Sequence, residues 1–380
     1  MTVLIDVLGM GIIIPVLPFY VETFGASALT LTLLFSVYAL FSFVSGPFLG
    51  ALSDRIGRRP VLIASIVSTA IGWFVFASAH AIWVLFLGRI IDGMAAGNLP
   101  ITQSYLVDIA RNDKERTTNL GIIGAVFGVG FIIGPAIGGA LSSISHPLPF
   151  FFVGGLATLN AAGALLFLPE SLTHPDREKK MALNPFRPLV NAVRDRPLRS
   201  RYVAWFFFGL SFSGLQSIFA LYLGKVFGFN VAMVGSIYTG MGIVIFANQT
   251  ILLRRFWLSF FSESALEIWP FLSNAVGVLL LMAPFVPFLV SGIVLYMFSQ
   301  SLLRVTVQSR AAGMAGPRRR GEVLGIMASV LSAAMIVGPL LAGSLFDIEP
   351  FLPFAACSLA LVSGFVTMKY FSAGAADSNT

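Results

Sequence analysis

Long apolar stretches separated by short polar segments run through the whole sequence. A helix of about 20 mostly apolar residues crosses the hydrocarbon core of a membrane, so this pattern restricts the chain to membrane-spanning folds. Only 11% of the residues are charged and 57% are hydrophobic, whereas soluble domains carry about 25% charged residues. The predicted spans, each placed to within about four residues, are 1–21, 29–52, 60–79, 81–107, 118–143, 148–168, 201–224, 231–253, 264–284, 286–309, 321–345 and 350–371.

The basic residues are distributed unevenly between the two sides of these spans. All but three of the 24 Lys and Arg residues lie in the loops after even-numbered spans or near the C-terminus. Because basic loops stay on the cytoplasmic side, we predict cytoplasmic termini and a location in the cell inner membrane. The net charge of +7 is therefore an orientation signal, and no nucleic-acid partner is expected. The three exceptions are Lys225, at an outer helix end, and Arg89 and Arg304, within spans.

An internal repeat indicates two matching halves. Leu120–Gly139 reads LGIIGAVFGVGFIIGPAIGG, and Leu324–Gly343 reads LGIMASVLSAAMIVGPLLAG. The same offset pairs Arg116 with Arg320, Pro149 with Pro353, and Phe150 with Phe354. Parallel halves of this kind place the substrate path at their interface.

A stretch rich in proline and charge separates the two halves and is predicted to be a cytoplasmic linker. The predicted domains are an N-terminal six-helix bundle, 1–168, the linker, 169–200, and a C-terminal six-helix bundle, 201–380. The predicted fold class is an all-α membrane protein of twelve transmembrane helices, with its two bundles related by a pseudo-two-fold axis.

The N-terminus and the single cysteine add two minor expectations. Met1 opens directly into the first apolar span, without the basic region or cleavage site of a signal peptide. Because this span lacks a cytoplasmic flank, we expect several residues to be missing before it. Cys357 lies in an apolar run and is expected to be a core or lipid-facing residue.

Two glycine-containing motifs stand in the N-terminal half. The loop after the second span reads GALSDRIGRRPVL, in which Gly50 is expected to permit close helix approach and Gly57 a tight turn. In the fifth span, glycines allow helix backbones to touch and a proline permits a kink. This second motif, G-x8-G-x3-GP-x2-GG, comprises Gly121, Gly130, Gly134, Pro135, Gly138 and Gly139.

These motifs resemble those of the major facilitator superfamily, whose drug-exporting antiporters carry the second one. The first span, IDVLGMGIIIPVLPFY, resembles that of the tetracycline-resistance type of drug/proton antiporter, and Gly88–Asn98 (GRIIDGMAAGN) resembles the helix 4 signature. The resemblance covers both halves and implies the major facilitator fold and drug/proton antiport. The chain departs from the family between the eighth and ninth spans, where LRRFWLSFFSESALEIW lacks the glycine turn of a second loop motif.

Asp6, Arg89 and Asp92 are the candidate proton-coupling residues. Charged side chains inside a membrane are costly and are functional candidates by default. Asp6, about 8 Å inside the cytoplasmic boundary, is expected to load and release a proton, as the resemblance also implies. Its alternative role is a helix-end carboxylate in interfacial water. For Arg89 and Asp92, which share a helix face, the alternative is an ordinary internal ion pair.

The resemblance also implies a cytoplasmic latch. In it an aspartate meets the positive end of the eleventh helix, and an arginine binds the aspartate at the inner end of the fourth span. The alternative is that the arginines only anchor the loop by the positive-inside rule. The predicted members are Gly50, Asp54, Arg55, Gly57, Arg58, Arg59 and Asp108.

Aromatic and amide side chains within the spans are candidates for a substrate cavity. Each one alone is also consistent with packing between helices. Arg304 is the exception, because a cation within a span needs a reason, and binding an anionic group is one. Glu263 and Glu267 are expected at the membrane interface. The remaining cavity candidates are Tyr38, Gln103, Phe208, Gln216, Tyr222, Gln249 and Gln300.

The sequence carries no catalytic constellation: its histidines lie in loops or at helix ends, and it has no GxxxxGK[ST] loop. We expect no enzyme activity, no metal and no cofactor other than the proton as coupling ion. The predicted function is proton-coupled efflux of small amphipathic compounds, such as tetracycline-like drugs, by a monomer surrounded by membrane lipid. Two alternatives stay open: uptake or exchange of a sugar or organic anion, and a non-transporting receptor or scaffold.

Overall fold

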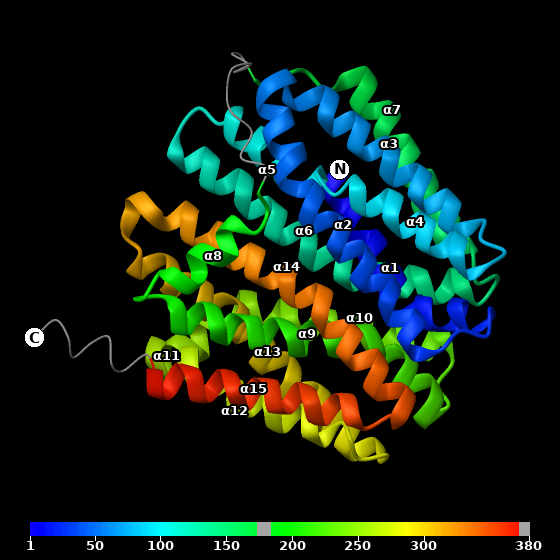
Figure 1. The fold of residues 1–380 in the computed structure, drawn as a ribbon, viewed down its shortest axis with the longest axis vertical. Helices are drawn as coiled ribbons and strands as arrows, with labels where there is room; N and C mark the ends of the chain where they lie inside the picture. Colours follow the sequence, from blue (N-terminus) through cyan, green and yellow to red (C-terminus); the bar gives the residue numbers. More distant parts are fainter. Residues whose placement is uncertain (173–183, 372–380) are drawn as a thin grey trace, which may run out of the picture. The chain divides into compact units, whose positions relative to one another are not determined.

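The computed structural model describes residues 1–172 and 184–371, and helices dominate both ranges (Figure 1). Within these ranges, 11 helical segments have the length and hydropathy to cross a membrane. The remaining predicted span, 264–284, corresponds to α12 (Glu263–Leu280), which carries Glu263 and Glu267 in its first two turns. The predicted all-α membrane fold class is confirmed.

The chain divides into two compact units. Unit 1 comprises 1–26, 37–185 and 229–240, and unit 2 comprises 27–36, 186–228 and the chain from Met241 onward. Two helices contribute to both units, because the start of α2 packs in unit 2 and the start of α10 packs in unit 1. The helices of the first half are α1 (Thr2–Glu22), α2 (Ala28–Ile56), α3 (Arg58–Ala77), α4 (Ile82–Met94), α5 (Asn98–Asp108), α6 (Asp113–Ser142) and α7 (Leu148–Phe167).

Several helices of the second half extend beyond their predicted spans. Polar residues at helix ends continue the helix outside the hydrocarbon core, where hydropathy gives no signal. The eighth span continues through a π-helix, η1, in place of the plain helix expected there. The elements are α8 (Arg187–Arg194), α9 (Arg199–Phe227), α10 (Val231–Ala247), η1 (Asn248–Trp257), α11 (Leu258–Phe260), α12, α13 (Val286–Met314), α14 (Gly316–Ile348) and α15 (Leu352–Phe371).

Each unit has an aromatic core. In unit 1, the Phe150 ring lies 5.0 Å from Phe76 and 6.1 Å from Trp73, and the Tyr20 hydroxyl donates to the Phe76 carbonyl at 3.2 Å. In unit 2, α9, α14 and α15 lie side by side (Figure 1), and the Trp205 indole of α9 donates to the Met327 carbonyl of α14 at 3.1 Å. These cores give each unit a rigid frame for its polar groups.

The glycine and proline motif of the fifth predicted span lies in α6 and makes a close helix contact along most of its length. A Cβ added to Gly134 would lie 2.9 Å from the Gly11 Cα of α1, and one added to Gly138 would lie 3.2 Å from the Ile12 Cα. Gly130 likewise faces α1, at Val7. The packing role is confirmed there, but Gly121 meets nothing within 4 Å and has no such role.

The internal repeat is a repeat of contacts as well as of sequence. Gly338 of α14 packs on the α9 backbone at Leu210, as Gly134 packs on α1. Gly139 packs on the start of α10 within unit 1, and Gly343 packs on the start of α2 within unit 2. The two copies of the motif therefore use matching glycines for matching helix contacts.

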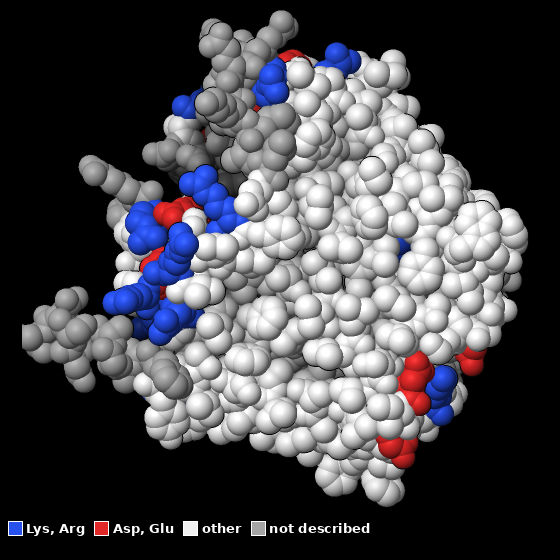
Figure 2. Space-filling model, viewed as in Figure 1, with Lys and Arg blue, Asp and Glu red and all other residues white. Residues whose placement is uncertain are grey.

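In the described parts of the predicted linker, 169–172 and 184–200, the short helix α8 lies before the start of α9. Asp195, just after α8, accepts a hydrogen bond from Arg319 of α14 at 2.8 Å. Figure 2 shows basic side chains gathered where α8 and the start of α14 lie, with a few acidic side chains among them. The central basic residues Arg177, Lys179 and Lys180 lie outside the described residues.

Candidate functional site

Arg89 of α4 is buried among aromatic rings of unit 1. Its guanidinium carbon lies 4.5 Å from the Trp73 ring centroid, 4.7 Å from Phe76 and 5.6 Å from Tyr38, and only 4% of the residue is exposed. Rings at these distances attract a cation through their negative faces. Glycines on α3 and α4 bring the two helices together here, because a Cβ on Gly72 would lie 3.0 Å from the Gly88 carbonyl oxygen.

Arg89 forms an ion pair with Asp92, one turn along α4, at 3.4 Å. The alternative of an internal pair is therefore correct for their geometry. The pair is incomplete, however, because Arg89 Nε and one terminal nitrogen have no hydrogen-bond partner among the described residues. Two unused donors on a buried arginine require an explanation, such as a water, a ligand or a changing partner.

The fourth span is interrupted beside this pair. It was predicted as one helix over 81–107, but α4 ends at Met94 and α5 begins at Asn98. Pro100 provides the physical reason, since it has no N–H to donate to the Ala96 carbonyl and so opens the helix there. Broken helices in transporters carry ion and substrate sites. This break places the buried Asn98 amide against the Asp6 carboxylate of α1.

Asp6 and Asp92 are linked through two neutral side chains. The Asn98 amide donates to Asp6 Oδ1 at 3.1 Å and to Thr69 Oγ1 of α3 at 3.3 Å, and Thr69 also makes a polar interaction with the Asp92 side chain. The network therefore joins α1, α3, α4 and α5 within unit 1. It unites all three predicted proton-coupling residues and adds Asn98 and Thr69, which sequence reasoning missed although Asn98 closes the quoted helix 4 signature.

The predicted latch residues assemble around one arginine of unit 1. Arg58 pairs with Asp54 at 2.5 Å and with Asp108 at 3.1 Å, and it also donates to the Ser53 hydroxyl at 2.7 Å. The arrangement ties the end of α2 and the end of α5 to the first residue of α3. Contact of Asp54 with the eleventh helix stays a prediction.

Gly57 and Gly50 of the loop motif behave differently. Gly57 has φ = +109°, a conformation that glycine adopts without strain, so the expected tight turn is confirmed. Gly50 has open space around its Cα, with nothing within 4 Å of an added Cβ. The described residues of unit 1 therefore give no close helix approach at Gly50, contrary to the expectation.

Glu170 completes the loop structure from the far end of α7. Its carboxylate accepts hydrogen bonds from the backbone N–H groups of Arg58, Arg59, Ser171 and Leu172 at 2.9–3.1 Å. Two of these donors are unpaired N–H groups of the first turn of α3, where the helix dipole favours a negative charge. Burial alone raises the pKa of Glu170, but the backbone donors outweigh it and hold the pKa below its ordinary value. Arg59 also reaches the Leu165 carbonyl at 2.7 Å, and Arg55 stays exposed enough to serve as an anchor.

Unit 2 lacks the second loop motif, and it has instead a cluster of one acid and two arginines, called here the Glu267 triad. Glu267 of α12 accepts two hydrogen bonds from Arg201 of α9, at 2.7 and 3.1 Å, and one from Arg310 of α13 at 2.8 Å. Only 1% of Glu267 is exposed, so it is buried by protein near the start of α12, and its place at the membrane interface stays a prediction. Glu263 is exposed, as expected, and lies 3.7 Å from Arg310.

The candidate cavity residues separate into packed and open side chains. Phe208 and Tyr222 belong to the core of unit 2: Phe208 stacks on Trp205 at 4.8 Å, and the Tyr222 hydroxyl donates to the Leu281 carbonyl at 2.7 Å. Both are at most 2% exposed, so the prediction that they line a cavity is wrong. Cys357 is likewise a core residue. Gln300 is buried, Tyr38 and Gln216 are half-buried, and Gln103, Gln249 and Arg304 are exposed.

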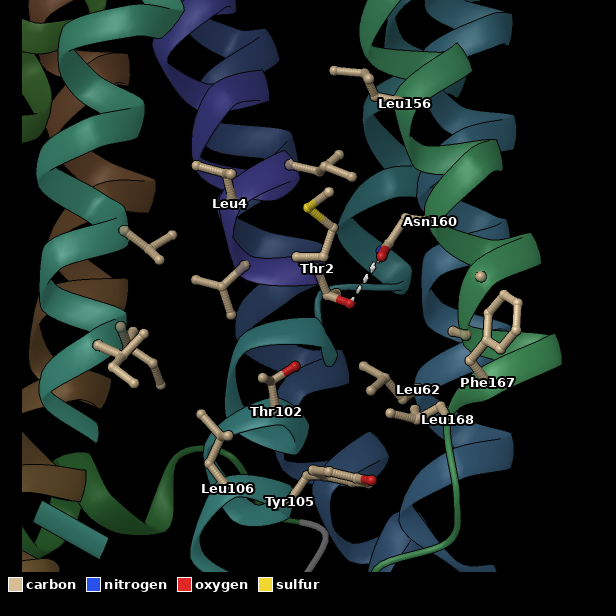
Figure 3. A pocket seen from close by; sticks show the side chains of 18 of the residues that line it. Thr2, Leu4, Leu62, Thr102, Tyr105, Leu106, Leu156, Asn160, Phe167 and Leu168 are labelled. Atoms are coloured by element: carbon tan, nitrogen blue, oxygen red, sulfur yellow. Dashed lines mark hydrogen bonds between the residues drawn. The ribbon is translucent and has the colours of Figure 1, made fainter. Parts of the chain in front are cut away.

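A separate cavity of about 600 Å³ lies in unit 1 near the start of α1 (Figure 3). Its wall is largely aliphatic, with Leu4 and Leu106 among the lining side chains. The Asn160 amide of α7 donates to the Thr2 hydroxyl at 3.0 Å on this wall. The cavity shares no residue with the Asp6 to Arg89 network, and the sequence predicted none of its lining. Nowhere in the described ranges do three His, Cys, Asp or Glu side chains gather as a metal site would require.

Comparisons with known proteins agree with this architecture. The family model described as "Major Facilitator Superfamily" matches residues 1–265. The quinolone resistance protein NorA of Staphylococcus aureus (strain MSSA476) is 28% identical over 347 residues, covering 90% of this chain and 87% of NorA. Multidrug resistance protein 2 of Bacillus subtilis (strain 168) is 26% identical over 365 residues, covering 94% and 90%.

Solved structures share the fold. The human organic anion transporter MFSD10 (TETRAN) superposes with a TM-score of 0.72 at 23% identity and 97% coverage of both chains. The peptide transporter POT superposes with a TM-score of 0.79 at 15% identity, covering 96% of this chain and 92% of POT. The family model matches most of the chain, and the structure shows the broken fourth span, the loop motif and the close glycine contacts between α1 and α6. This protein is therefore a multi-pass membrane transporter, not an enzyme, and belongs to the major facilitator superfamily.

Proposed function

We propose that this chain is a proton-coupled exporter of small amphipathic compounds, including quinolone-like drugs, in the bacterial inner membrane. Support for drug export comes from its similarity along nearly the whole chain to proteins named for quinolone and multidrug resistance. Support for proton coupling comes from the Asp6–Asn98–Thr69–Asp92–Arg89 network, which carries the proposal. Tetracycline-like compounds belong to the same proposed substrate class.

The network suits proton coupling because its charges do not balance when both acids are ionised. Two carboxylates then share one arginine, and an uncompensated buried charge is costly. Uptake of one proton removes that imbalance and frees Arg89 to change partner, for which its two unused donors are available. A proton arriving from outside therefore favours one conformer, and substrate binding favours the other, as exchange by alternating access requires.

Transport by inverted membrane vesicles tests the proposal. An imposed pH gradient should drive accumulation of norfloxacin and ethidium, and Asp6→Asn should abolish the gradient-driven part of that accumulation. Arg89→Ala should leave downhill equilibration while removing its dependence on the gradient. Glu22→Gln is the matched control, because Glu22 is an exposed acid on the same helix. Gradient-driven transport that survives Asp6→Asn contradicts the coupling role.

A second function, transport of an organic anion, is favoured by one observation only. Arg304 is a cation within a membrane span that has no carboxylate partner among the described residues, and an anionic substrate supplies one. Accumulation of a small dicarboxylate but of neither drug in the same vesicles would select this function.

A further inference from the structure

The cavity near the start of α1 belongs neither to the Asp6 to Arg89 network nor to the loop motif. Its volume of about 600 Å³ is within the range of pockets that hold small ligands. Its lining comes from α1, α3, α5, α6 and α7 of unit 1, at the helix ends that the basic loops predict to be cytoplasmic. Along α7 the lining runs from Leu156 to Phe167, or about 16 Å at the helical rise. The cavity is therefore long enough to take an extended hydrocarbon chain.

The cavity opens on the outer surface of unit 1, where its lining includes exposed apolar side chains. Ile122 of α6 is 54% exposed, and Leu159 and Phe167 of α7 are 71% and 82% exposed. Deeper lining residues are buried, with Ile5 of α1 and Ile123 of α6 at most 7% exposed. Because hydrocarbon surrounds the outer faces of membrane-spanning helices, the molecules that meet this opening are lipids.

The aliphatic wall carries a few polar side chains near the helix ends (Figure 3). Thr102 lies about 9 Å along α5 from its last residue, Asp108, and Asn160 lies about 10 Å along α7 from Phe167. Asn160 is hydrogen-bonded to Thr2, but the buried Thr102 hydroxyl has no hydrogen-bond partner among the described residues. A buried hydroxyl of this kind requires an explanation. None of the described lining residues has a charged side chain, so a neutral acceptor suits Thr102 best.

We propose that this cavity binds one acyl chain of a glycerophospholipid from the leaflet on the predicted cytoplasmic side. The ester carbonyl of that chain accepts a hydrogen bond from Thr102, and the hydrocarbon tail lies against Val126 and Leu156. Lipid esters lie at the edge of the hydrocarbon core, within the layer of about 5–7 Å that the polar region adds on each side, and Thr102 is close to that depth. The bound chain also packs on Ile5, next to Asp6. This inference does not depend on the exporter proposal.

A variant that fills the cavity tests the binding site. Gly163 of α7 lines the cavity, and a Cβ added there meets nothing within 4 Å, so a leucine side chain has room. Native mass spectrometry of the detergent-solubilised full chain, titrated with dioleoylphosphatidylcholine, gives the apparent Kd of the bound lipid. Gly163→Leu should raise that Kd by about tenfold, the loss expected when two buried methylene groups are displaced.

Gly155→Leu is the matched control for the filled cavity. Gly155 lies on the same helix and also has open space around an added Cβ, but it does not line the cavity. Its Kd should stay within about twofold of wild type. The lipid should also raise the Tm of wild type and of Gly155→Leu, because a ligand that binds only the folded state stabilises it. The rise should be smaller in Gly163→Leu.

A second pair of ligands tests the hydrogen bond from Thr102. Thr102→Val removes the hydroxyl at nearly constant volume and should raise the Kd for the diester lipid by about twofold to tenfold, as expected for one neutral hydrogen bond. The corresponding diether lipid has no ester carbonyl, so wild type and Thr102→Val should bind it equally. Thr102→Ser keeps a hydroxyl and should restore affinity for the diester. An equal loss of both lipids in Thr102→Val overturns the assignment of the carbonyl to Thr102.

Two further outcomes overturn the lipid site itself. One is equal affinity of wild type and Gly163→Leu for the lipid. The other is displacement of the lipid by norfloxacin together with loss of norfloxacin binding in Gly163→Leu, because the cavity is then a drug pocket. These measurements require no proton gradient and no turnover. Failure of the chain to export drugs from vesicles therefore contradicts the proposed function and leaves the lipid site standing.

Discussion

Glu267 binds two arginines that come from different helices of unit 2, and it has almost no contact with solvent. Replacing it by Gln leaves the buried Arg201 without its counter-charge and leaves Arg310 with only the exposed Glu263. Breaking a buried pair in this way costs about 3–5 kcal/mol. We therefore expect Glu267→Gln to lower the Tm of the purified protein strongly. The double variant Glu267→Gln with Arg201→Gln should recover part of that loss, and an unchanged Tm in the single variant would contradict the role given to the triad.

Glu170 lies outside the membrane spans, and its surroundings lower the pKa of its carboxyl group. Its folded-state pKa is depressed by backbone donors, so its stabilising effect is present above the ordinary Glu value and is lost as the pH falls through the lower folded-state pKa. Glu170→Gln should therefore lower the Tm at pH 7, and the difference from wild type should shrink below about pH 4. A Tm difference that stays constant from pH 7 to pH 3.5 would show that the carboxylate charge does not hold the start of α3.

Single residues also show where sequence reasoning stops. Asp6, Arg89 and Asp92 were identifiable because a charge inside an apolar span is conspicuous by itself. Asn98 and Thr69 were not, because a neutral polar residue in a span has no signal until its partners are placed. The burial of Glu267 was missed for a related reason: its arginine partners lie 66 and 43 residues away in the sequence, so the sequence alone showed only an acid near a helix end.

Among the helices, the seam between α1 and α6 is the contact most sensitive to a single methyl group. Gly134→Ala places a Cβ about 2.9 Å from the Gly11 backbone, which cannot yield as a flexible side chain can. Overpacking of this kind costs about 1–3 kcal/mol, so we expect a lower Tm and weaker transport. Gly121→Ala, in the same helix but facing open space, is the matched control and should behave as wild type. Equal effects of the two substitutions would rule out the seam as the cause.

Element boundaries were predictable to the extent that the membrane itself sets them. Hydropathy located the 11 helical segments that have the length and composition of spans, because the requirement for about 20 apolar residues acts on the sequence directly. It could not show that the fourth span breaks, although Gly97 and Pro100 carried that signal. The π-helix at Asn248–Trp257 had no signal, since its register depends on the contacts of Asn248 with α13.

At the scale of the whole molecule, the two units exchange helix ends. Residues 229–240, which include the start of α10, complete unit 1 beside Gly139. Residues 27–36, which include the start of α2, complete unit 2, where Asp347 accepts hydrogen bonds from the Ala28 and Leu29 N–H groups at 2.9 and 3.0 Å. The first half of the sequence therefore does not contain all of unit 1, and the second half does not contain all of unit 2. Composition predicts a linker between the halves, but it carries no sign of this exchange.

Separate expression of the halves tests the exchange. Fragments 1–185 and 186–380, made alone, should give little monodisperse protein in gel filtration, because each leaves a glycine-lined helix face uncovered. Co-expression of the two fragments should restore a complex that elutes together. If either fragment alone is as monodisperse as the intact chain, the exchanged ends contribute little to its stability.

The same exchange has a consequence for biogenesis. About 90 residues separate Gly139 from its partners on α10, and a ribosome adding about 5–20 residues per second needs roughly 5–18 s to make them. During that interval the end of α6 has been inserted, but the helix that covers it does not yet exist. Lipid or the insertion machinery must occupy that face in the meantime. The first half therefore completes its helix packing only after the second half has been synthesised. We expect the yield of this membrane protein to depend on the speed of translation through the linker.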